Sequence, residues 1–71
     1  MIAVECGFDY GITPNEGNLR AFSALREVYG IRRLHLDRTA RRIQVEFDAS
    51  RIRREQIAGL LLKTGIDLQT S

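Results

Sequence analysis

The sequence predicts a small α+β domain in which one four-stranded antiparallel sheet carries two helices on a single face. Three observations favour this fold class. Residues 2–8 and 42–47 alternate apolar with polar side chains, which is the period of a half-buried strand. Residues 14–29 and 53–64 repeat apolar side chains at helical spacing, and each run ends at a glycine. Further short apolar segments place the elements in the order β-α-β-β-α-β.

The first strand should direct its even-numbered side chains toward the core. The apolar residues at those positions are Ile2, Val4, Cys6 and Phe8. Cys6 would then be a small core residue, because a free cysteine usually behaves as a buried hydrophobe.

A capping box is expected at the start of the first helix. Thr13 would be the N-cap, Pro14 would take the first helical position, and Glu16 would reach back to the N–H of the cap. The apolar stripe that follows consists of Leu19, Phe22, Leu25 and Val28. Gly30 should end the helix as a C-terminal cap.

A β-hairpin follows, with its turn at residues 37–40. Its apolar positions are Ile31, Leu34 and Leu36 before the turn, and Ile43, Val45 and Phe47 after it. Arg42, Gln44 and Glu46 alternate with the second set, so one face of the hairpin should be wet.

A second helix should cover about residues 53–64. The residues that it should bury, with Ile52 at its entrance, are Ile57, Leu60 and Leu61. Gly59 inside this helix costs up to ~1 kcal/mol relative to alanine, which we interpret as a sign of close packing at that position. Gly65 should end the helix, and Ile66 and Leu68 should form a short last strand.

Two halves of this kind fold into the ferredoxin-like arrangement. The helices should cover the apolar face of the sheet. The residues expected on the other, wet face are Glu5, Arg33, His35, Arg42, Gln44 and Glu46. This fold carries metal chaperones, RNA binders, ligand sensors and enzymes, so the fold by itself does not decide the function.

Composition narrows the kind of protein. We expect one domain over residues 1–71, because a chain this short has a single thin core. No segment approaches the roughly 18 apolar residues of a membrane span, and the amino terminus lacks the pattern of a signal peptide. The single cysteine excludes an internal disulfide and fits a reducing compartment, so we expect a cytoplasmic protein. Eight arginines lie between Arg32 and Arg54, which leaves an anionic partner as one alternative.

Several spacings resemble the heavy-metal-associated (HMA) domain family, the fold of small copper chaperones and of the amino-terminal modules of metal-pumping ATPases. That family begins its first helix with the pattern G-M-T-C-x-x-C, and a second glycine, followed by Val or Ile, comes nineteen residues after the first. Gly11 and Gly30-Ile31 keep this separation, and Thr13 is unchanged. Gly65-Ile66 matches the family near its end, so the resemblance covers nearly the whole chain.

The metal-binding loop is where this sequence departs from the family. Pro14 and Gly17 stand at the positions of the two ligand cysteines, and neither has a side-chain donor. Because two thiolates are what hold Cu(I) in such loops, the resemblance implies that the metal site is lost, and we expect no cofactor. Lys63 belongs to a Lys-Thr-Gly loop like that of eukaryotic copper chaperones. Its ammonium group would either lie at the C-terminus of a helix, where a cation is favoured, or form an ion pair with Glu16 or with a carboxylate of a partner.

Two further departures concern local structure. Just before Gly11, the positions whose side chains should face the core are shifted by one residue relative to the family. This shift predicts a bulge within residues 8–11. Arg53 occupies the usual place of an Asp or Ser cap, so the second helix should begin without that stabilising group.

Other side chains could in principle replace the missing cysteines. The candidate donors are Cys6, Asp9, Tyr10, Asn15, Glu16 and His35. Cys6 should point inward and His35 should lie on the wet face, so the three or four ligands that a transition metal needs should not converge. Asp9 and Glu16 could hold a hard cation weakly.

Catalysis and nucleic-acid binding have little support in the sequence. The nearest acid–base candidates, His35 with Asp37 or Glu46, would lie on an open sheet with nothing to exclude water. Ferredoxin-like RNA binders stack bases on aromatic residues of the central strands, and the wet-face positions here carry none. The arginines could still contact phosphate nonspecifically.

The predicted function is therefore that of a non-catalytic HMA-like module for protein interaction or regulation, linked to heavy-metal transport or handling. Its contact surface would consist of Gly11, Ile12, Thr13, Pro14, Asn15, Glu16, Gly17 and Lys63. The partner would be another metal-handling protein or a like domain, and the free edges of the sheet also allow self-association. Two alternatives are metal binding through non-standard ligands, shared across a dimer, and an arginine-rich nucleic-acid-binding module.

Overall fold

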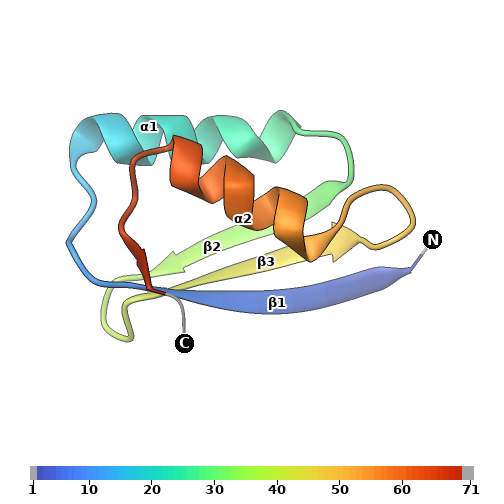
Figure 1. Ribbon diagram of the computed structural model, residues 1–71, viewed down its shortest axis with the longest axis horizontal. Coiled ribbons are helices and arrows are strands. Elements are labelled where there is room, and N and C mark those ends of the chain that lie inside the picture. Colours follow the sequence, from blue (N-terminus) through green and yellow to red (C-terminus); the bar gives the residue numbers. More distant parts are fainter. Residues whose placement is uncertain (1, 70–71) are drawn as a thin grey trace.

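The computed structural model describes residues 2–69. Its elements are β1 (Ala3–Tyr10), α1 (Glu16–Ala24), the 3₁₀ turn η1 (Leu25–Glu27), β2 (Ile31–Asp37), β3 (Arg42–Asp48), α2 (Arg54–Lys63) and β4 (Leu68–Gln69). The strands form one antiparallel sheet in the order β2-β3-β1-β4, and both helices lie on the same face of it (Figure 1). The structure confirms the predicted α+β, ferredoxin-like fold.

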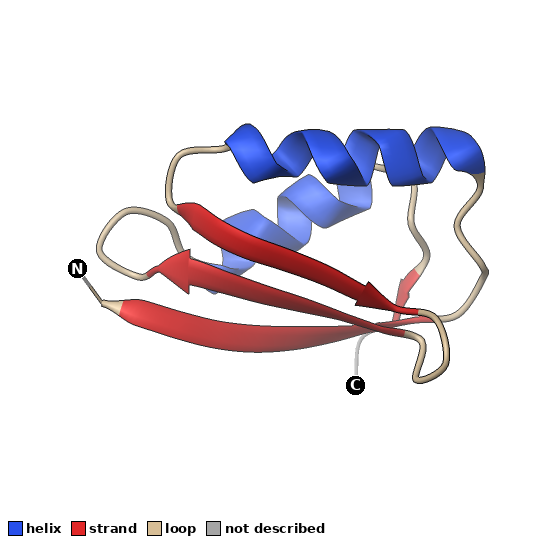
Figure 2. Ribbon diagram, turned by 180° about the vertical axis from the view of Figure 1, so that it is seen from behind, coloured by secondary structure: helices blue, strands red, loops and turns tan. Residues whose placement is uncertain are grey.

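The core lies between the sheet and the two helices, as Figure 2 shows from behind. Its fully buried centre consists of Ile43 and Val45 from β3 and Ile57 and Leu61 from α2. The other buried apolar residues are Phe8, Tyr10, Phe22, Leu25, Ile31, Leu34, Phe47, Ile52 and Ile66. Neither helix of the described residues has the length and apolar character needed to cross a membrane.

The prediction for β1 is right for its second half and wrong for its beginning. Phe8 is buried, and Cys6 is half-buried and packs against the core. Ile2 and Val4, expected inside, are 61% and 38% exposed. In Figure 1 the amino-terminal end of β1 projects past the start of α2, which agrees with this exposure.

The bulge predicted within residues 8–11 is absent from the pairing of β1 with β3. That register is unbroken from Ala3 opposite Asp48 to Asp9 opposite Arg42. The irregularity lies instead in β2, where two steps along the strand, Ile31 to Arg33, match one step along β3.

The cap of α1 also differs from the prediction of Thr13 and Glu16. Asn15 is the N-cap, and its Oδ1 accepts a hydrogen bond from the Asn18 N–H at 2.8 Å. The Asn18 Oδ1 accepts from the Asn15 N–H at 3.0 Å, which completes a reciprocal capping box two residues further along. Pro14 therefore precedes the cap and is outside the helix.

The ends of α2 are close to the predicted ones, whereas the prediction that Gly30 caps the first helix is wrong: the C-cap of α1 is Leu25, and Val28 is already extended. α1 tightens into η1 after Ala24, and Gly30 makes the turn into β2 with φ +99°. At the start of α2 the Gln56 Oε1 accepts from the Arg53 N–H at 2.9 Å, so a side chain three residues later supplies the stabilisation expected to be missing. The close packing proposed for Gly59 is wrong, because no atom lies within 4 Å of where its Cβ would be.

Candidate functional site

The loop of residues 11–17 is tied to the sheet at its first residue. The Gly11 N–H donates to the Asp67 carbonyl at 3.0 Å, just before β4 begins. A Cβ on Gly11 would come within 2.7 Å of both the Asp67 Oδ2 and the Gln69 Nε2. The start of the loop therefore lies against Asp67 and Gln69, next to the strand that ends the described chain.

The far end of the loop is tied to α2. The Asn18 Nδ2 donates to the Thr64 carbonyl at 2.8 Å, while the Oδ1 of the same side chain completes the cap of α1. Thr64 is buried, and its hydroxyl donates to the Leu61 carbonyl. These contacts place the start of α1 beside the end of α2, so Lys63 lies in the segment adjoining the loop (Figure 1).

Between these two anchors the loop exposes most of its side chains. Ile12 is 71% exposed, which is unusual for a large aliphatic residue in a small domain. Pro14 is the buried residue of the loop, whereas Thr13, Asn15, Glu16 and Gly17 are exposed. Lys63 is also exposed, and no ion pair joins it to Glu16 within residues 2–69. The result is a braced loop that presents one apolar side chain among polar ones.

The candidate metal ligands do not come together. Cys6 faces the helices, and burial raises the pKa of its thiol. His35 is exposed, and Asp9 lies 3.6 Å from the Arg42 guanidinium. No group of three or more His, Cys, Asp or Glu side chains suited to a metal ion occurs in the described part of the chain. Pro14 lies before α1 and Gly17 in its first turn, and neither has a side-chain donor atom.

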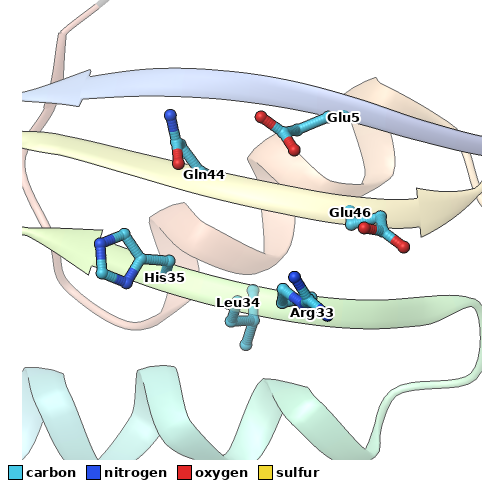
Figure 3. A pocket seen from close by; sticks show the side chains of 6 residues that line it. All are labelled: Glu5, Arg33, Leu34, His35, Gln44 and Glu46. Atoms are coloured by element: carbon cyan, nitrogen blue, oxygen red, sulfur yellow. The ribbon is translucent and has the colours of Figure 1, made fainter.

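The wet face holds a shallow hollow of about 290 Å³. Its lining side chains include Glu5, Arg33, His35, Gln44 and Glu46, and Figure 3 shows them spread along three strands. His35 lies opposite Gln44 in the sheet, whereas Glu46 lies opposite Arg33. His35 and Glu46 are therefore a strand step apart and do not form an acid–base pair. No Phe, Tyr or Trp side chain lines the hollow.

Sequence reasoning missed the role of Asn18. This residue closes the capping box and bridges the two helices. The spacing of Asn15 and Asn18 was a signal for the cap, because asparagine is among the best N-cap residues. The bond to Thr64 joins residues 46 positions apart, so no local pattern could have indicated it.

Comparisons with solved structures place this fold among known ones. Oxidized MerP from Ralstonia metallidurans CH34 superposes with a TM-score of 0.77 at 14% sequence identity, over 96% of this chain and 96% of that one. A copper CopA variant from Bacillus subtilis superposes with a TM-score of 0.74 at 15% identity, over 94% of this chain and 90% of that one. No protein-family model matches the sequence. No curated protein matches it either. At these identities the likeness concerns the fold.

Proposed function

We propose that this chain is a non-catalytic HMA-like module that binds another protein and takes part in heavy-metal handling without holding Cu(I) through a cysteine pair. The observation that carries the proposal is the braced loop of residues 11–17. This segment runs from the end of β1 into the first turn of α1. The family resemblance in the sequence sets Pro14 and Gly17 at the positions of the two ligand cysteines, which supports the proposal. The likeness in fold to MerP and to copper CopA supports the link to metal handling.

The proposed contact surface is the loop together with Lys63. A rigid loop loses little conformational entropy on binding, because its backbone is already ordered before the partner arrives. Its ends are held by the Gly11 bond to Asp67 and the Asn18 bond to Thr64. Ile12 would supply the apolar contact and Lys63 a charge for a carboxylate of the partner. We expect that partner to be a metal-handling protein or a like domain in the cytoplasm.

A metal titration tests the loss of the site. Cu(I) or Zn(II) is added to ¹⁵N-labelled protein, and backbone chemical shifts are followed by NMR. The matched control is the double variant Pro14→Cys and Gly17→Cys, which restores both thiolates on the same loop. We expect stoichiometric Cu(I) binding by the double variant, with shifts at residues 11–18, and none by the native chain. Tight binding of Cu(I) by the native loop would overturn the proposal.

The alternative of non-standard ligands is tested by the same titration. Cys6→Ser and His35→Ala remove the soft donors that could be shared across a dimer. Under our proposal neither substitution changes the response of the protein to metal. A metal-dependent dimer that is lost in either variant would favour the alternative.

The contact surface is tested with a like domain as probe. The metal-binding domain of CopA from Bacillus subtilis, whose fold matches this chain, is added to the labelled protein. Shift changes confined to residues 11–17 and Lys63, and weakened by Ile12→Asp, would support the surface. Changes centred on the wet face would contradict it, and no binding would remove this like domain from the set of partners.

A further inference from the structure

The two edges of the sheet are built differently. The edge formed by β2 is protected: it carries the irregularity at Ile31–Arg33, and the Arg26 guanidinium donates to the outward carbonyl of Leu34 at 3.4 Å. Bulges, charges and covering side chains are the usual means by which proteins prevent an edge strand from pairing with another chain. The opposite edge has no such irregularity, because the pairing of β1 with β3 is regular from Ala3 to Asp9. Its charged side chains are Glu5 on the strand, with Arg42 beside Gly7 and Arg54 beside Phe8.

That opposite edge is the outer side of β1. β4 pairs only with Asp9 and Tyr10, so residues 3–8 have no described strand beside them. The Tyr10 N–H points to the β3 side, toward the Arg41 carbonyl, whereas the Gly11 N–H points outward to Asp67. Because hydrogen-bonding direction alternates along a strand, the N–H and C=O groups of Ala3, Glu5 and Gly7 also point outward. Within residues 2–69 these groups form a short ladder beside which no strand lies.

Apolar side chains accompany this ladder on the helix face. Ile2 and Val4 are 61% and 38% exposed although they continue the apolar alternation of β1. Next to them, a hollow of about 400 Å³ opens at Gly7–Asp9. The other residues that line it are Arg42, Arg54, Ala58, Leu62, Leu68 and Gln69. Leu62 is 59% exposed. The Arg54 guanidinium lies over the Phe8 ring in the middle of this hollow, so the exposed apolar side chains are those of Ile2, Val4 and Leu62 on either side of it.

We propose that a second copy of this chain pairs with the β1 edge, β1 against β1 in antiparallel orientation, and covers Ile2 and Val4. A second copy fits because β1 itself is the strand that this edge requires. It has outward main-chain groups at the odd residues and small to medium apolar side chains at residues 2, 4 and 6. The inference does not rest on the proposed function, because none of these residues belongs to the loop.

Charge and β4 select one register for this pairing. Placing Glu5 opposite Glu5 of the second copy would set like charges face to face, beside Glu46, which is already opposite Glu5 in β3. Placing Cys6 opposite Cys6 would bring Ala3 of the second copy against Asp9, but the outer side of Asp9 is already paired with β4. Of the registers that avoid both conflicts, the one that pairs the most described residues sets Val4 opposite Val4 and Glu5 opposite Ala3. In it the exposed Ile2 of one copy meets Cys6 of the other.

This pairing leaves both loops free. The two-fold axis would pass beside Val4, seven residues before Gly11, so at about 3.4 Å per residue the two loops lie roughly 50 Å apart at opposite ends of the pair. A dimer would therefore present two contact surfaces facing away from each other. With about four main-chain hydrogen bonds across the edge, we expect a dissociation constant on the order of 0.1 mM.

Cysteine cross-linking tests the register. Val4→Cys in a Cys6→Ser background puts two thiols at a non-hydrogen-bonded pair, where the Cα atoms lie about 4.5 Å apart, within the range that a disulfide spans. We expect this variant to form a covalent dimer under mild oxidation. The matched control, Glu5→Cys in the same background, places each thiol opposite Ala3 and should cross-link at least about tenfold more slowly. Equal rates for the two variants would overturn the proposed register.

Sedimentation equilibrium of the native chain tests the dimer itself. We expect concentration-dependent dimerisation up to about 1 mM, weakened roughly tenfold or more by Glu5→Pro. That substitution removes an outward N–H but no bond to β3, so the fold should persist, which circular dichroism verifies. Val4→Lys is a second disrupting variant that leaves the backbone unchanged. A strictly monomeric native chain, or dimers that persist in both variants, would overturn the proposal.

Discussion

Asp48 is the residue on which the turn from β3 to α2 depends. Its Oδ1 accepts from the Ser50 hydroxyl at 2.6 Å, from the Ser50 N–H at 3.0 Å and from the Ile2 N–H at 3.3 Å. Its Oδ2 accepts from the Arg51 Nε at 3.0 Å, and the Arg51 guanidinium lies 4.5 Å from the centre of the Tyr29 ring. One nearly buried carboxylate thus joins the start of β1, the end of β3 and the turn before α2.

These contacts make the stability of the fold depend on pH. The hydrogen bond from the Ser50 side chain is the main cause that lowers the pKa of Asp48 below its usual value. A carboxyl whose pKa is lower in the folded state than in the unfolded state stabilises the fold above the unfolded pKa. That stabilisation is lost as the pH falls below about 4 and through the lowered folded pKa.

We therefore predict that Asp48→Asn lowers the free energy of unfolding near pH 7 and that its difference from the native chain narrows at about pH 3. The measurement is urea unfolding followed by circular dichroism at both pH values. Glu55→Gln, which removes an exposed carboxylate from α2, is the control and should show no such narrowing. A difference of the same size at both pH values would contradict the role given to the charge of Asp48.

At the scale of elements, α1 and α2 are joined by one asparagine. Asn18 uses its oxygen for the cap of α1 and its amide nitrogen for the Thr64 carbonyl at the end of α2. Gly65 follows with φ +86°, and a Cβ there would lie 2.6 Å from the Asn18 Nδ2. The junction that supports the loop therefore needs both the amide of Asn18 and the absence of a side chain at Gly65.

We predict that Asn18→Ala lowers the free energy of unfolding by about 1–2 kcal/mol, because the Asn15 N–H loses its acceptor and the bond to Thr64 is lost, while the bond from the backbone N–H of residue 18 to the Asn15 Oδ1 remains. Asn18→Asp separates the two effects, since a carboxylate can still accept from the Asn15 N–H but cannot donate to Thr64. Urea unfolding measures both variants. An Asn18→Ala protein as stable as the native one would show that the junction contributes nothing.

A second prediction at this scale concerns Gly59, which lies in the middle of α2 with open space where its Cβ would be. Gly59→Ala should raise the free energy of unfolding by up to about 1 kcal/mol, because alanine restricts the unfolded chain and favours the helix. The opposite result is expected for Gly65→Ala, where the positive φ makes a side chain unfavourable. Thermal unfolding of the Gly59→Ala and Gly65→Ala proteins provides the comparison. A Gly59→Ala protein less stable than the native chain would contradict the finding that the Cβ position of Gly59 faces open space.

At the scale of the whole molecule, several arginines already form ion pairs or ring contacts within the chain. Arg42 pairs with Asp9 at 3.6 Å, Arg51 with Asp48 at 3.0 Å, and Arg32 with Glu46 at 3.4 Å. The Arg54 guanidinium lies 4.9 Å from the centre of the Phe8 ring. The chain has 11 lysines and arginines against 9 acidic residues, so its net charge of +2 gives little overall attraction to a polyanion.

We predict that the chain does not bind nucleic acid appreciably near physiological salt. Fluorescence anisotropy with a labelled single-stranded RNA and a labelled duplex, at low and at physiological salt, tests this. Any weak binding at low salt should fall steeply as salt increases. Replacing Arg41, Arg42 and Arg54 by Gln provides the control. Tight binding at physiological salt that this triple variant loses would favour the nucleic-acid alternative.

Most of the fold could be predicted from the sequence. The alternation of β3, the apolar stripes of α1 and α2 and the glycines at residues 30 and 65 indicate the elements and their order. The local errors have a common cause. The N-cap at Asn15, the irregularity of β2 and the Gln56 bond to Arg53 depend on which of several suitable partners a backbone group meets. Local propensity does not choose between such partners.

The sequence by itself determined the α+β fold and the absence of donor side chains at residues 14 and 17, because periodicity and residue chemistry are local properties. Only the tertiary structure decided where the loop is held and which strand edge is unpaired. Those features depend on contacts between distant residues, such as Gly11 with Asp67 and Asn18 with Thr64. The exposure of Ile2 and Val4 is decided in the same way, because a strand pattern says which face is apolar but not how far the helices extend over it.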